Sequence, residues 1–249
     1  MPTRVELRNV TKSFGPKHVL RGVSTVFPPG QNTVVIGPSG CGKSTVLKLL
    51  LGLQKPDEGQ VVVDEKDLAT FSERDWQEYR SRMGMVFQGA ALFDSLSIAQ
   101  NVAFGLTEHT RKPKAEILEI AEEKLRLVGL KGQGHLRPSE ISGGMQKRAG
   151  IARAIARDPE LVLYDEPTTG LDPITSTVIE DLIVDVARRT GATSIVVTHQ
   201  LSTIFRTAAR IVMLFEGRVL GEGSPEELRD SPNPTIRGFL RGEVPPGWV

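Results

Sequence analysis

Short apolar runs separated by helical spacings predict a core of buried parallel strands. Mostly apolar runs occupy residues 33–36, 83–87, 161–164 and 194–197, and such runs are typical of strands buried on both faces. Between the last two runs, apolar residues recur at helical spacing over residues 174–189. Because successive strands joined by one helix usually run parallel, we expect a parallel sheet with helices packed against it.

The two ends of the chain favour antiparallel pairing instead. Val5, Leu7 and Val10 follow a mostly alternating pattern, and residues 23–27 continue it up to a Pro-Pro-Gly turn. Residues 211–220 contain two apolar runs around a short turn, which predicts a hairpin. We therefore expect an N-terminal antiparallel β subdomain beside the parallel core.

The chain loses its β-branched runs over residues 90–158, approximately. Helical spacing occurs there at residues 114–128 and again at 151–156. We interpret this region as a helical subdomain inserted into an α/β core. Residues 1–242 are then expected to form one domain, and the Pro- and Gly-rich residues 243–249 a C-terminal tail.

Composition and charge narrow the range of functions. The chain has 249 residues, with 31 basic and 30 acidic side chains and a formal net charge of +1, so no nucleic-acid partner is expected. Its single cysteine, Cys41, excludes a disulfide within the chain and favours a cytosolic setting. We expect no signal peptide and no membrane-spanning helix, because no apolar run approaches ~20 residues. Any membrane role therefore needs a partner that crosses the bilayer.

A glycine-rich segment between an apolar strand and an apolar helix fits the phosphate-binding pattern G-x-x-x-x-G-K-[ST]. Its residues are Gly37, Pro38, Ser39, Gly40, Cys41, Gly42, Lys43, Ser44 and Thr45. Glycines let several backbone N–H groups converge on one anion, and the helix N-terminus adds its dipole. Lys43 is expected to reach the β- and γ-phosphates and Ser44 to bind Mg²⁺. The alternative is a flexible glycine turn.

Two carboxylates follow directly after a buried strand. Asp165 is expected to bind Mg²⁺, because strand ends of this kind face the ligand crevice of a parallel sheet. Glu166 is then placed to act as general base on the attacking water. The alternative is an acidic pair on the surface at the end of a strand.

Two further strand ends carry polar residues. His199 can donate a hydrogen bond to a γ-phosphate oxygen, although a histidine at this position is often structural. Gln88 can touch the water shell of the metal, but many strands end in Gln, so chemistry alone argues weakly for it.

A second possible phosphate cradle lies in the helical region. Ser142 is a good helix N-cap, and Gly143 and Gly144 allow backbone N–H groups to approach an anion closely. One γ-phosphate does not need two full cradles from one chain, so we expect this one to serve the nucleotide of another subunit. An ordinary N-cap is the alternative.

Taken together and in this order, the motifs resemble the nucleotide-binding subunits of ATP-binding cassette (ABC) transporters over nearly the whole chain. The matching segments are residues 37–45, Gln88, residues 141–145, residues 161–166, residues 170–172 and His199. The resemblance implies a head-to-tail homodimer with two shared sites for ATP and Mg²⁺. Each ATP would contact Lys43, Ser44, Asp165 and Glu166 of one copy and Ser142, Gly143 and Gly144 of the other.

The resemblance also implies roles for single residues. Gln88 would connect the metal site to the helical subdomain, which meets an integral membrane permease dimer. Asp172 would lie in a loop that communicates across the dimer, and Phe14 would stack on adenine, where the family more often has Tyr. By the same resemblance, the catalytic residues are Glu166, His199 and Gln88, and the metal ligands are Ser44, Gln88 and Asp165.

The signature segment departs from the family pattern at Ile141, where Leu is usual, and at Met145, where Gln is usual. With residues 89–93 and 172–176, these departures are similar to the ATPases of mammalian-cell-entry-type (MCE) lipid transporters. That similarity implies transport of phospholipid or another lipid across the cell envelope, with a periplasmic MCE-type lipid-binding partner. It places the chain on the cytoplasmic face of the inner membrane, as a peripheral subunit.

Three other functions stay open at this point. One is an ABC importer ATPase for amino acids or another small solute. Another is an ABC-type ATPase acting on DNA or ribosomes, which usually carries long coiled-coil insertions or two cassettes. The third is a non-catalytic nucleotide-binding regulator, which the pair Asp165 and Glu166 disfavours. A separate hypothesis is that Trp248 in the tail docks on the second subunit.

Overall fold

The computed structural model describes residues 1–243, and within them the chain is organised around a six-stranded sheet with the order β10-β9-β3-β8-β7-β6. The strands are β3 (Asn32–Ile36), β6 (Met83–Val86), β7 (Leu161–Asp165), β8 (Thr193–Val197), β9 (Arg210–Phe215) and β10 (Arg218–Gly223). Neighbouring strands run parallel, except that β10 is antiparallel to β9. The α/β class, the parallel sheet and the hairpin at residues 211–220 are thus confirmed.

A smaller antiparallel sheet packs beside it with the order β2-β1-β4-β5. Its strands are β1 (Val5–Phe14), β2 (Lys17–Phe27), β4 (Glu58–Val63) and β5 (Lys66–Asp67). It confirms the antiparallel pairing that the alternating residues near the N-terminus predict.

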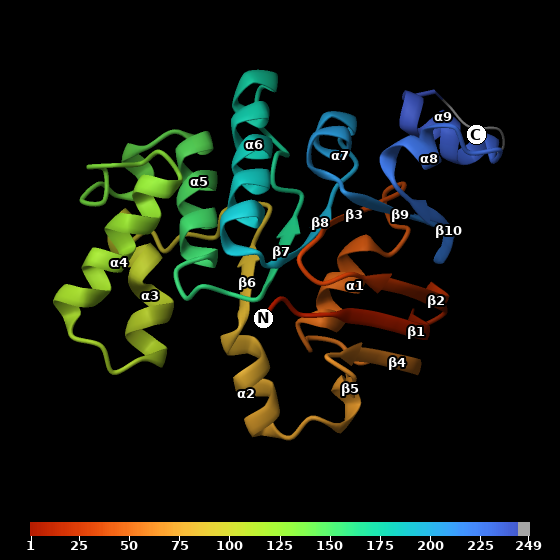
Figure 1. The fold of residues 1–249 in the computed structure, drawn as a ribbon, viewed down its shortest axis with the longest axis horizontal. Coiled ribbons are helices and arrows are strands. Elements are labelled where there is room, and N and C mark those ends of the chain that lie inside the picture. Colours follow the sequence, from red (N-terminus) through yellow and green to blue (C-terminus); the bar gives the residue numbers. More distant parts are fainter. Residues whose placement is uncertain (244–249) are drawn as a thin grey trace.

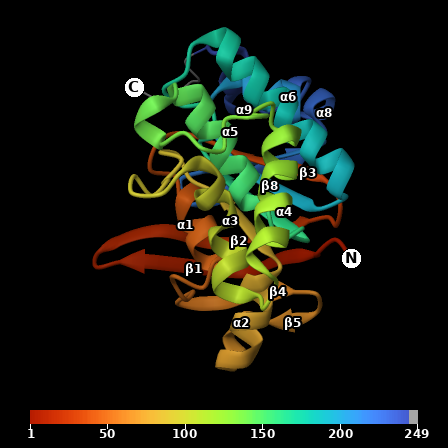
Figure 2. The same cartoon turned by 90° about the vertical axis from the view of Figure 1, so that its left-hand side faces the viewer.

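Helices cover the central sheet and extend beyond it. Their bounds are α1 (Lys43–Leu50), α2 (Glu73–Ser81), α3 (Ile98–His109), α4 (Lys114–Leu127), α5 (Gly143–Ala154), α6 (Pro173–Thr190), α7 (Leu201–Thr207), α8 (Pro225–Arg229) and α9 (Pro234–Arg241). Short 3₁₀ turns occupy Leu68–Thr70 and Pro138–Glu140. The three helices between β6 and β7, namely α3, α4 and α5, gather on the side of the molecule away from the antiparallel sheet (Figure 1 and Figure 2).

Buried side chains of the central strands alternate between two hydrophobic cores, because successive residues of a strand point to opposite faces. In β3, Val34 and Ile36 join a core that includes residues of α3 to α7, whereas Val35 joins a core built with α1 and the antiparallel sheet. In β7, Val162 and Leu163 divide in the same way. Two cores therefore fix the strands whose ends carry the candidate site.

The N-cap expected at Ser142 is confirmed, because its side chain accepts a hydrogen bond from Met145 N at 3.3 Å. The helical stretch expected from residue 151 onward is the end of the same helix, α5, which begins at Gly143. Another helix, α3, is not among the helices expected from the sequence, although Ile98, Val102 and Leu106 recur at intervals of four residues on its buried face. Its start is marked by a reciprocal cap between Ser97 and Gln100.

No helix among the described residues is long and apolar enough to cross a membrane. The hypothesis that Trp248 docks on a second subunit concerns a residue outside the described range.

Candidate functional site

The glycine-rich segment forms a tight loop between β3 and α1, and its conformation requires glycine. Gly37 has φ 144° and Gly42 has φ 111°, values that other residues rarely adopt. A Cβ on Gly37 would lie 2.1 Å from Leu214 O, and one on Gly42 would lie 2.5 Å from Leu20 Cδ2. The loop therefore packs its backbone against neighbouring strands, which shapes the concave side that an anion can enter.

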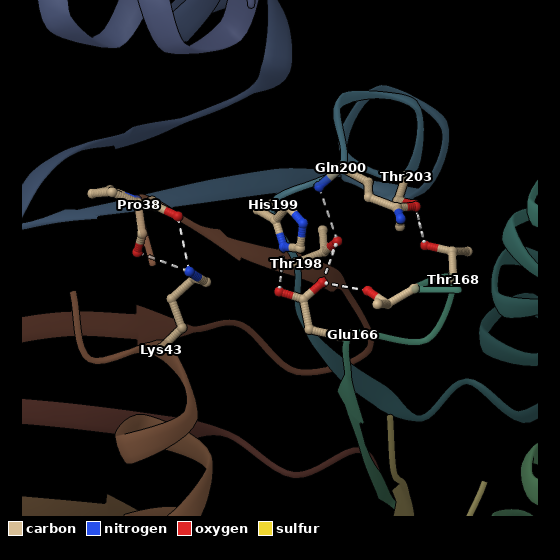
Figure 3. Close-up of polar contacts among 10 residues, drawn as sticks. Pro38, Lys43, Glu166, Thr168, Thr198, His199, Gln200 and Thr203 are labelled. Carbon is tan, nitrogen blue, oxygen red and sulfur yellow. Dashed lines mark hydrogen bonds and ion pairs between the residues drawn. The ribbon is translucent and has the colours of Figure 1, made fainter. Parts of the chain in front are cut away.

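Lys43, the first residue of α1, lies over this loop. It is buried, and its Nζ donates hydrogen bonds to Gly37 O at 2.8 Å and Pro38 O at 3.0 Å (Figure 3). These bonds hold a positive charge at the helix N-terminus, where backbone N–H groups also favour an anion. The arrangement fits a phosphate group.

Beside the loop lies a hollow of about 290 Å³. Its lining residues are Phe14, Lys17, Val19, Gly40, Gly42, Lys43, Ser44 and Thr45. Phe14 is 44% exposed, and Lys12 Nζ lies 5.7 Å from the centroid of its ring. An exposed aromatic face next to a phosphate cradle is suited to stacking on a nucleobase, as the sequence led us to expect.

Asp165 ends β7 near the start of α1, where Ser44 and Lys43 favour its ionised form. Burial, followed by the neighbouring charge of Glu166, raises the pKa of Asp165, while Ser44, Lys48 and Lys43 act in the opposite direction. A carboxylate and a hydroxyl are oxygen ligands of the kind Mg²⁺ takes beside nucleotide phosphates. Among residues 1–243, no group of three or more His, Cys, Asp or Glu residues is arranged to hold a metal ion. A Mg²⁺ ion at this place would therefore need the nucleotide phosphates as further ligands.

Glu166 follows β7 and meets the residues that follow β8. Its Oε1 lies 2.7 Å from His199 Nδ1, and its Oε2 accepts hydrogen bonds from Thr198 and Thr169, each at 3.2 Å (Figure 3). Its φ of 46° is unusual for a residue with a side chain, so its surroundings must hold it in this conformation. Because β7 and β8 are adjacent and parallel, their ends bring together Glu166 and His199, two candidates that the sequence indicates separately.

Gln88 follows β6, the next strand in the sheet. Its side chain is exposed, and its backbone carbonyl accepts a hydrogen bond from Lys147 Nζ of α5. Burial lowers the pKa of Lys147, although the charge of Glu166 favours the protonated form. Arg153 of α5 extends this attachment by donating to Ala90 O at 2.7 Å and Ala91 O at 2.5 Å.

Sequence reasoning missed Lys147 and Arg153 as parts of the site. Their acceptors are backbone carbonyls 59 to 63 residues away along the chain, so no local pattern could reveal them. Ala90 and Ala91 also have positive φ values, 59° and 49°, that their residue type does not suggest. The loop after Gln88 is thus fastened to α5 through its backbone.

The second predicted cradle lies at the N-terminus of α5. Ser142 and Gly143 are exposed, and a Cβ on Gly143 would meet no atom within 4 Å. Gly144 faces inward, because a Cβ there would lie 2.5 Å from Thr175 Cγ2. In Figure 1, β7 and α6 lie between α5 and α1, so one copy does not bring the two cradles together.

Asp172 caps α6. Its Oδ1 accepts hydrogen bonds from Ile174 N and Thr175 N, both at 3.0 Å, and its Oδ2 accepts one from Thr175 Oγ1 at 2.5 Å. The bond from the Thr175 hydroxyl, followed by the one from its backbone N–H, lowers the pKa of Asp172. Since Thr175 also packs on Gly144, α6 and the second cradle are in direct contact.

Comparison with known proteins gives the family. A family model described as ABC transporter matches residues 20–169. A Haemophilus influenzae relative, the intermembrane phospholipid transport system ATP-binding protein MlaF, is 41% identical over 96% of this chain and 90% of its own length. The chloroplastic protein TRIGALACTOSYLDIACYLGLYCEROL 3 of Arabidopsis thaliana is 45% identical over 96% of this chain and 74% of its own length.

Solved structures agree with this result. The dimeric structure of MJ0796, a bacterial ABC transporter cassette, superposes with a TM-score of 0.80 at 33% identity, covering 88% of this chain and 98% of that one. MJ0796 was also solved as a dimer in a post-hydrolysis state bound to ADP and Pi, with a TM-score of 0.79 at 33% identity and the same coverage. ATPases of this family dimerise and work with membrane permeases. This chain therefore belongs to the ABC transporter family and is an ATPase that binds ATP with Mg²⁺, as a peripheral subunit of a membrane transporter.

Proposed function

We propose that this ATPase energises the transport of phospholipid or another lipid across the cell envelope through a partner permease. The observation that carries the proposal is the similarity to MlaF of Haemophilus influenzae, 41% identical across 96% of this chain. We place the chain on the cytoplasmic face of the inner membrane. Its partners are an integral permease dimer and a periplasmic MCE-type lipid-binding protein, and residues 90–158 form the subdomain that meets the permease.

At each site, residues 37–45 bind the phosphates, and Ser44 and Asp165 hold Mg²⁺, with Gln88 at its water shell. The metal supplies positive charge that stabilises the transferring phosphoryl group. Glu166 accepts a proton from the attacking water through Oε1, the oxygen that lies 2.7 Å from His199. His199 orients that carboxylate and contacts the γ-phosphate, and Phe14 stacks on adenine.

Each site is completed by a second copy of the chain. Ser142, Gly143 and Gly144 of one copy cap the γ-phosphate bound to the other, and Asp172 lies between the two sites. Three observations support this arrangement: the exposure of Ser142 and Gly143, the position of β7 and α6 between α5 and α1 in Figure 1, and the dimeric form of MJ0796.

An exposed aromatic patch supports a membrane partner. Phe93 and Phe104 are 44% and 39% exposed, and their rings lie 4.7 Å apart. The patch borders the loop after Gln88, which α5 holds through its backbone. A permease helix that docked there would be coupled to movements of Gln88 and of the loop that follows it. Clustered exposed aromatic side chains are typical of protein–protein interfaces.

The deciding experiment is to purify the tagged chain with its membrane complex and identify the partner proteins and bound lipid by mass spectrometry. We expect a permease, an MCE-type protein and phospholipid above the level found with a Phe93→Ser, Phe104→Ser double variant, which cannot dock. The alternative is an importer ATPase for a small solute, because the relative named mkl from Mycobacterium tuberculosis is described as a probable ribonucleotide transport ATP-binding protein. Recovery of a small-solute permease without a lipid-binding partner would exclude lipid transport and favour an importer.

A further inference from the structure

Behind Glu166, away from the phosphate loop, lies a group of fully buried polar side chains. Thr168 and Thr203 are 0% exposed, and Glu180 of α6 is 1% exposed. Glu180 Oε1 accepts hydrogen bonds from Thr203 Oγ1 at 2.8 Å and from Ser202 Oγ at 2.9 Å. Because a buried carboxylate is costly unless it is well paired, this set of residues needs a reason to be polar.

The hydrogen bonds continue from Glu180 to the catalytic carboxylate. Thr203 Oγ1 lies 2.8 Å from Thr168 Oγ1, which lies 2.6 Å from the side-chain amide of Gln200 at Oε1 (Figure 3). The backbone N–H of Gln200 donates to Thr198 Oγ1 at 3.1 Å, and Thr198 Oγ1 donates to Glu166 Oε2 at 3.2 Å. Glu180 is therefore linked to Glu166 through the two loops that follow β7 and β8.

The number of hydroxyl protons determines the direction of these hydrogen bonds. Each threonine hydroxyl has one proton, so if Thr203 donates to an ionised Glu180, Thr168 must donate to Thr203. Thr168 has then no proton left for Gln200 and can only accept a hydrogen bond from it. The Gln200 side-chain amide must therefore turn its NH₂ group toward Thr168, a rotation that exchanges the amide oxygen and nitrogen and leaves the shape of the side chain unchanged. Every donor between the Gln200 side chain and Glu180 then points toward Glu180. Likewise, the Gln200 N–H makes Thr198 an acceptor, which leaves the single Thr198 proton for Glu166.

We propose that Glu180 is a positioning residue for ATP hydrolysis. Its buried carboxylate orients the hydroxyl protons of Thr203 and Thr168, and these fasten the loop after β7 to Gln200 at the start of α7. Glu166 has a φ of 46°, a strained conformation that persists only where surrounding contacts hold it. The network supplies such contacts, and it keeps Thr198 and His199 in place against the Glu166 carboxylate. The inference rests on the general-base role proposed for Glu166.

The test compares threonines of α7 in the full-length chain with its membrane complex. Thr203→Val preserves shape and removes the hydroxyl, and we expect kcat to fall about 10-fold, since small misplacements of a reacting group are costly, with KM for ATP changed less than about 2-fold. Thr203→Ser, which keeps the hydroxyl, should restore most of kcat. Thr207→Val is the matched control: Thr207 is also buried and donates to Thr203 O at 2.6 Å, but it lies outside the network.

We expect Thr207→Val to lower the melting temperature about as much as Thr203→Val does while keeping kcat near the wild-type value. Equal kcat losses in both variants, or an unchanged kcat in Thr203→Val, would overturn the proposal. Should Thr203→Val fail to fold, Glu180→Gln takes its place, because it keeps the size of the side chain and removes the charge that orients the protons. It should lower kcat with little change in KM, and a wild-type kcat would again overturn the proposal.

Two further measurements isolate the network. If Glu180 acts through Thr203, the double variant Glu180→Gln, Thr203→Val should lose no more kcat than the worse single variant, whereas multiplied losses would contradict the link. Glu166→Gln is assayed in parallel. Normal turnover in Glu166→Gln would exclude the general-base role itself. If Glu166→Gln lost turnover while Thr203→Val kept a normal kcat, only the positioning role of Glu180 would be excluded.

Discussion

Glu166 Oε1 and His199 Nδ1 lie 2.7 Å apart, although the two residues are 33 positions apart in the chain. The contact exists because β7 and β8 are neighbouring parallel strands, so the residues that follow them meet at one edge of the sheet. The other oxygen of the carboxylate accepts two threonine hydroxyls. The carboxylate is therefore held from both sides, as a base that must act on one particular water needs to be.

Replacing Glu166 by Gln should separate binding from hydrolysis. The amide keeps an oxygen that can accept from Thr198 but cannot take a proton, so we expect ATP affinity near the wild-type value and turnover at least ~100-fold slower. Glu216→Gln is the matched control, because Glu216 is an exposed glutamate with nearly the same φ angle, 48°. Single-turnover hydrolysis and nucleotide binding measure the two effects, and near-normal turnover would refute the role of Glu166.

Removing the ammonium of Lys43 should affect binding itself. Lys43→Ala deletes the charge that lies over the phosphate loop, so we expect ATP affinity to fall by at least ~10-fold, the scale of one charge-assisted hydrogen bond or more. Lys131→Ala, at an exposed lysine in a turn between helices, is the control for a general change in charge. Isothermal titration with a non-hydrolysable ATP analogue gives both affinities, and equal values would count against the loop as the phosphate site.

The shared-site arrangement can be tested with two mixed dimers that contain the same two changes. In the first, one copy carries Ser142→Ala and the other carries Lys43→Ala, which leaves one composite site intact. In the second, one copy carries both changes and its partner is wild type, which damages both composite sites. We expect the first dimer to keep about half of the ATPase activity and the second to lose most of it, and the reverse order would show that each copy works alone.

Asp165 should cost stability at neutral pH. Its folded-state pKa is raised by burial and by Glu166, so the folded protein favours the protonated form. The resulting contribution to stability is complete below the unfolded-state pKa of about 3.9 and is lost as pH rises through the folded-state pKa. At pH 7 the ionised carboxylate therefore destabilises the folded protein. Asp165→Asn should therefore raise the melting temperature at pH 7 by about 2 °C without nucleotide, while removing Mg²⁺-dependent turnover.

The control for that experiment is Asp94→Asn, at an exposed carboxylate in the loop before α3. We expect Asp94→Asn to leave the melting temperature unchanged at pH 7 and at pH 3. At pH 3, where Asp165 itself carries a proton, the difference between Asp165→Asn and wild type should shrink. A difference that stayed the same from pH 3 to pH 7 would mean that ionisation of Asp165 is not its source.

Local patterns predicted the parts of the molecule that are local. Residues 37–45 carry their whole chemistry in one contiguous stretch, and the apolar runs that form β7 and β8 lie next to the polar residues they position. The antiparallel sheet followed from alternation in β1. Helix α3 was not predicted, although Ile98, Val102 and Leu106 recur at intervals of four residues and the reciprocal cap at Ser97 was readable.

Contacts between distant segments could not be predicted. Lys147 was visible only as one basic residue of a helix, and its acceptor is the backbone of Gln88. Glu180 and Thr203 are ordinary polar residues in the sequence, and only the packing of α6 against α7 makes them a buried pair. Backbone acceptors carry no residue-type signal, so a search for patterns of side chains passes over them.

The alternation of β3, β7 and β8 between two cores also determines how far this enzyme can be altered. Deleting or inserting one residue within β7 would exchange the side chains of its two faces and turn Asp165 and Glu166 away from the nucleotide at the same time. Length changes in the connections among α3, α4 and α5 carry no such penalty. We therefore expect the family's freedom to vary in length to lie in the helical region, while the spacing from Leu161 to Glu166 tolerates none.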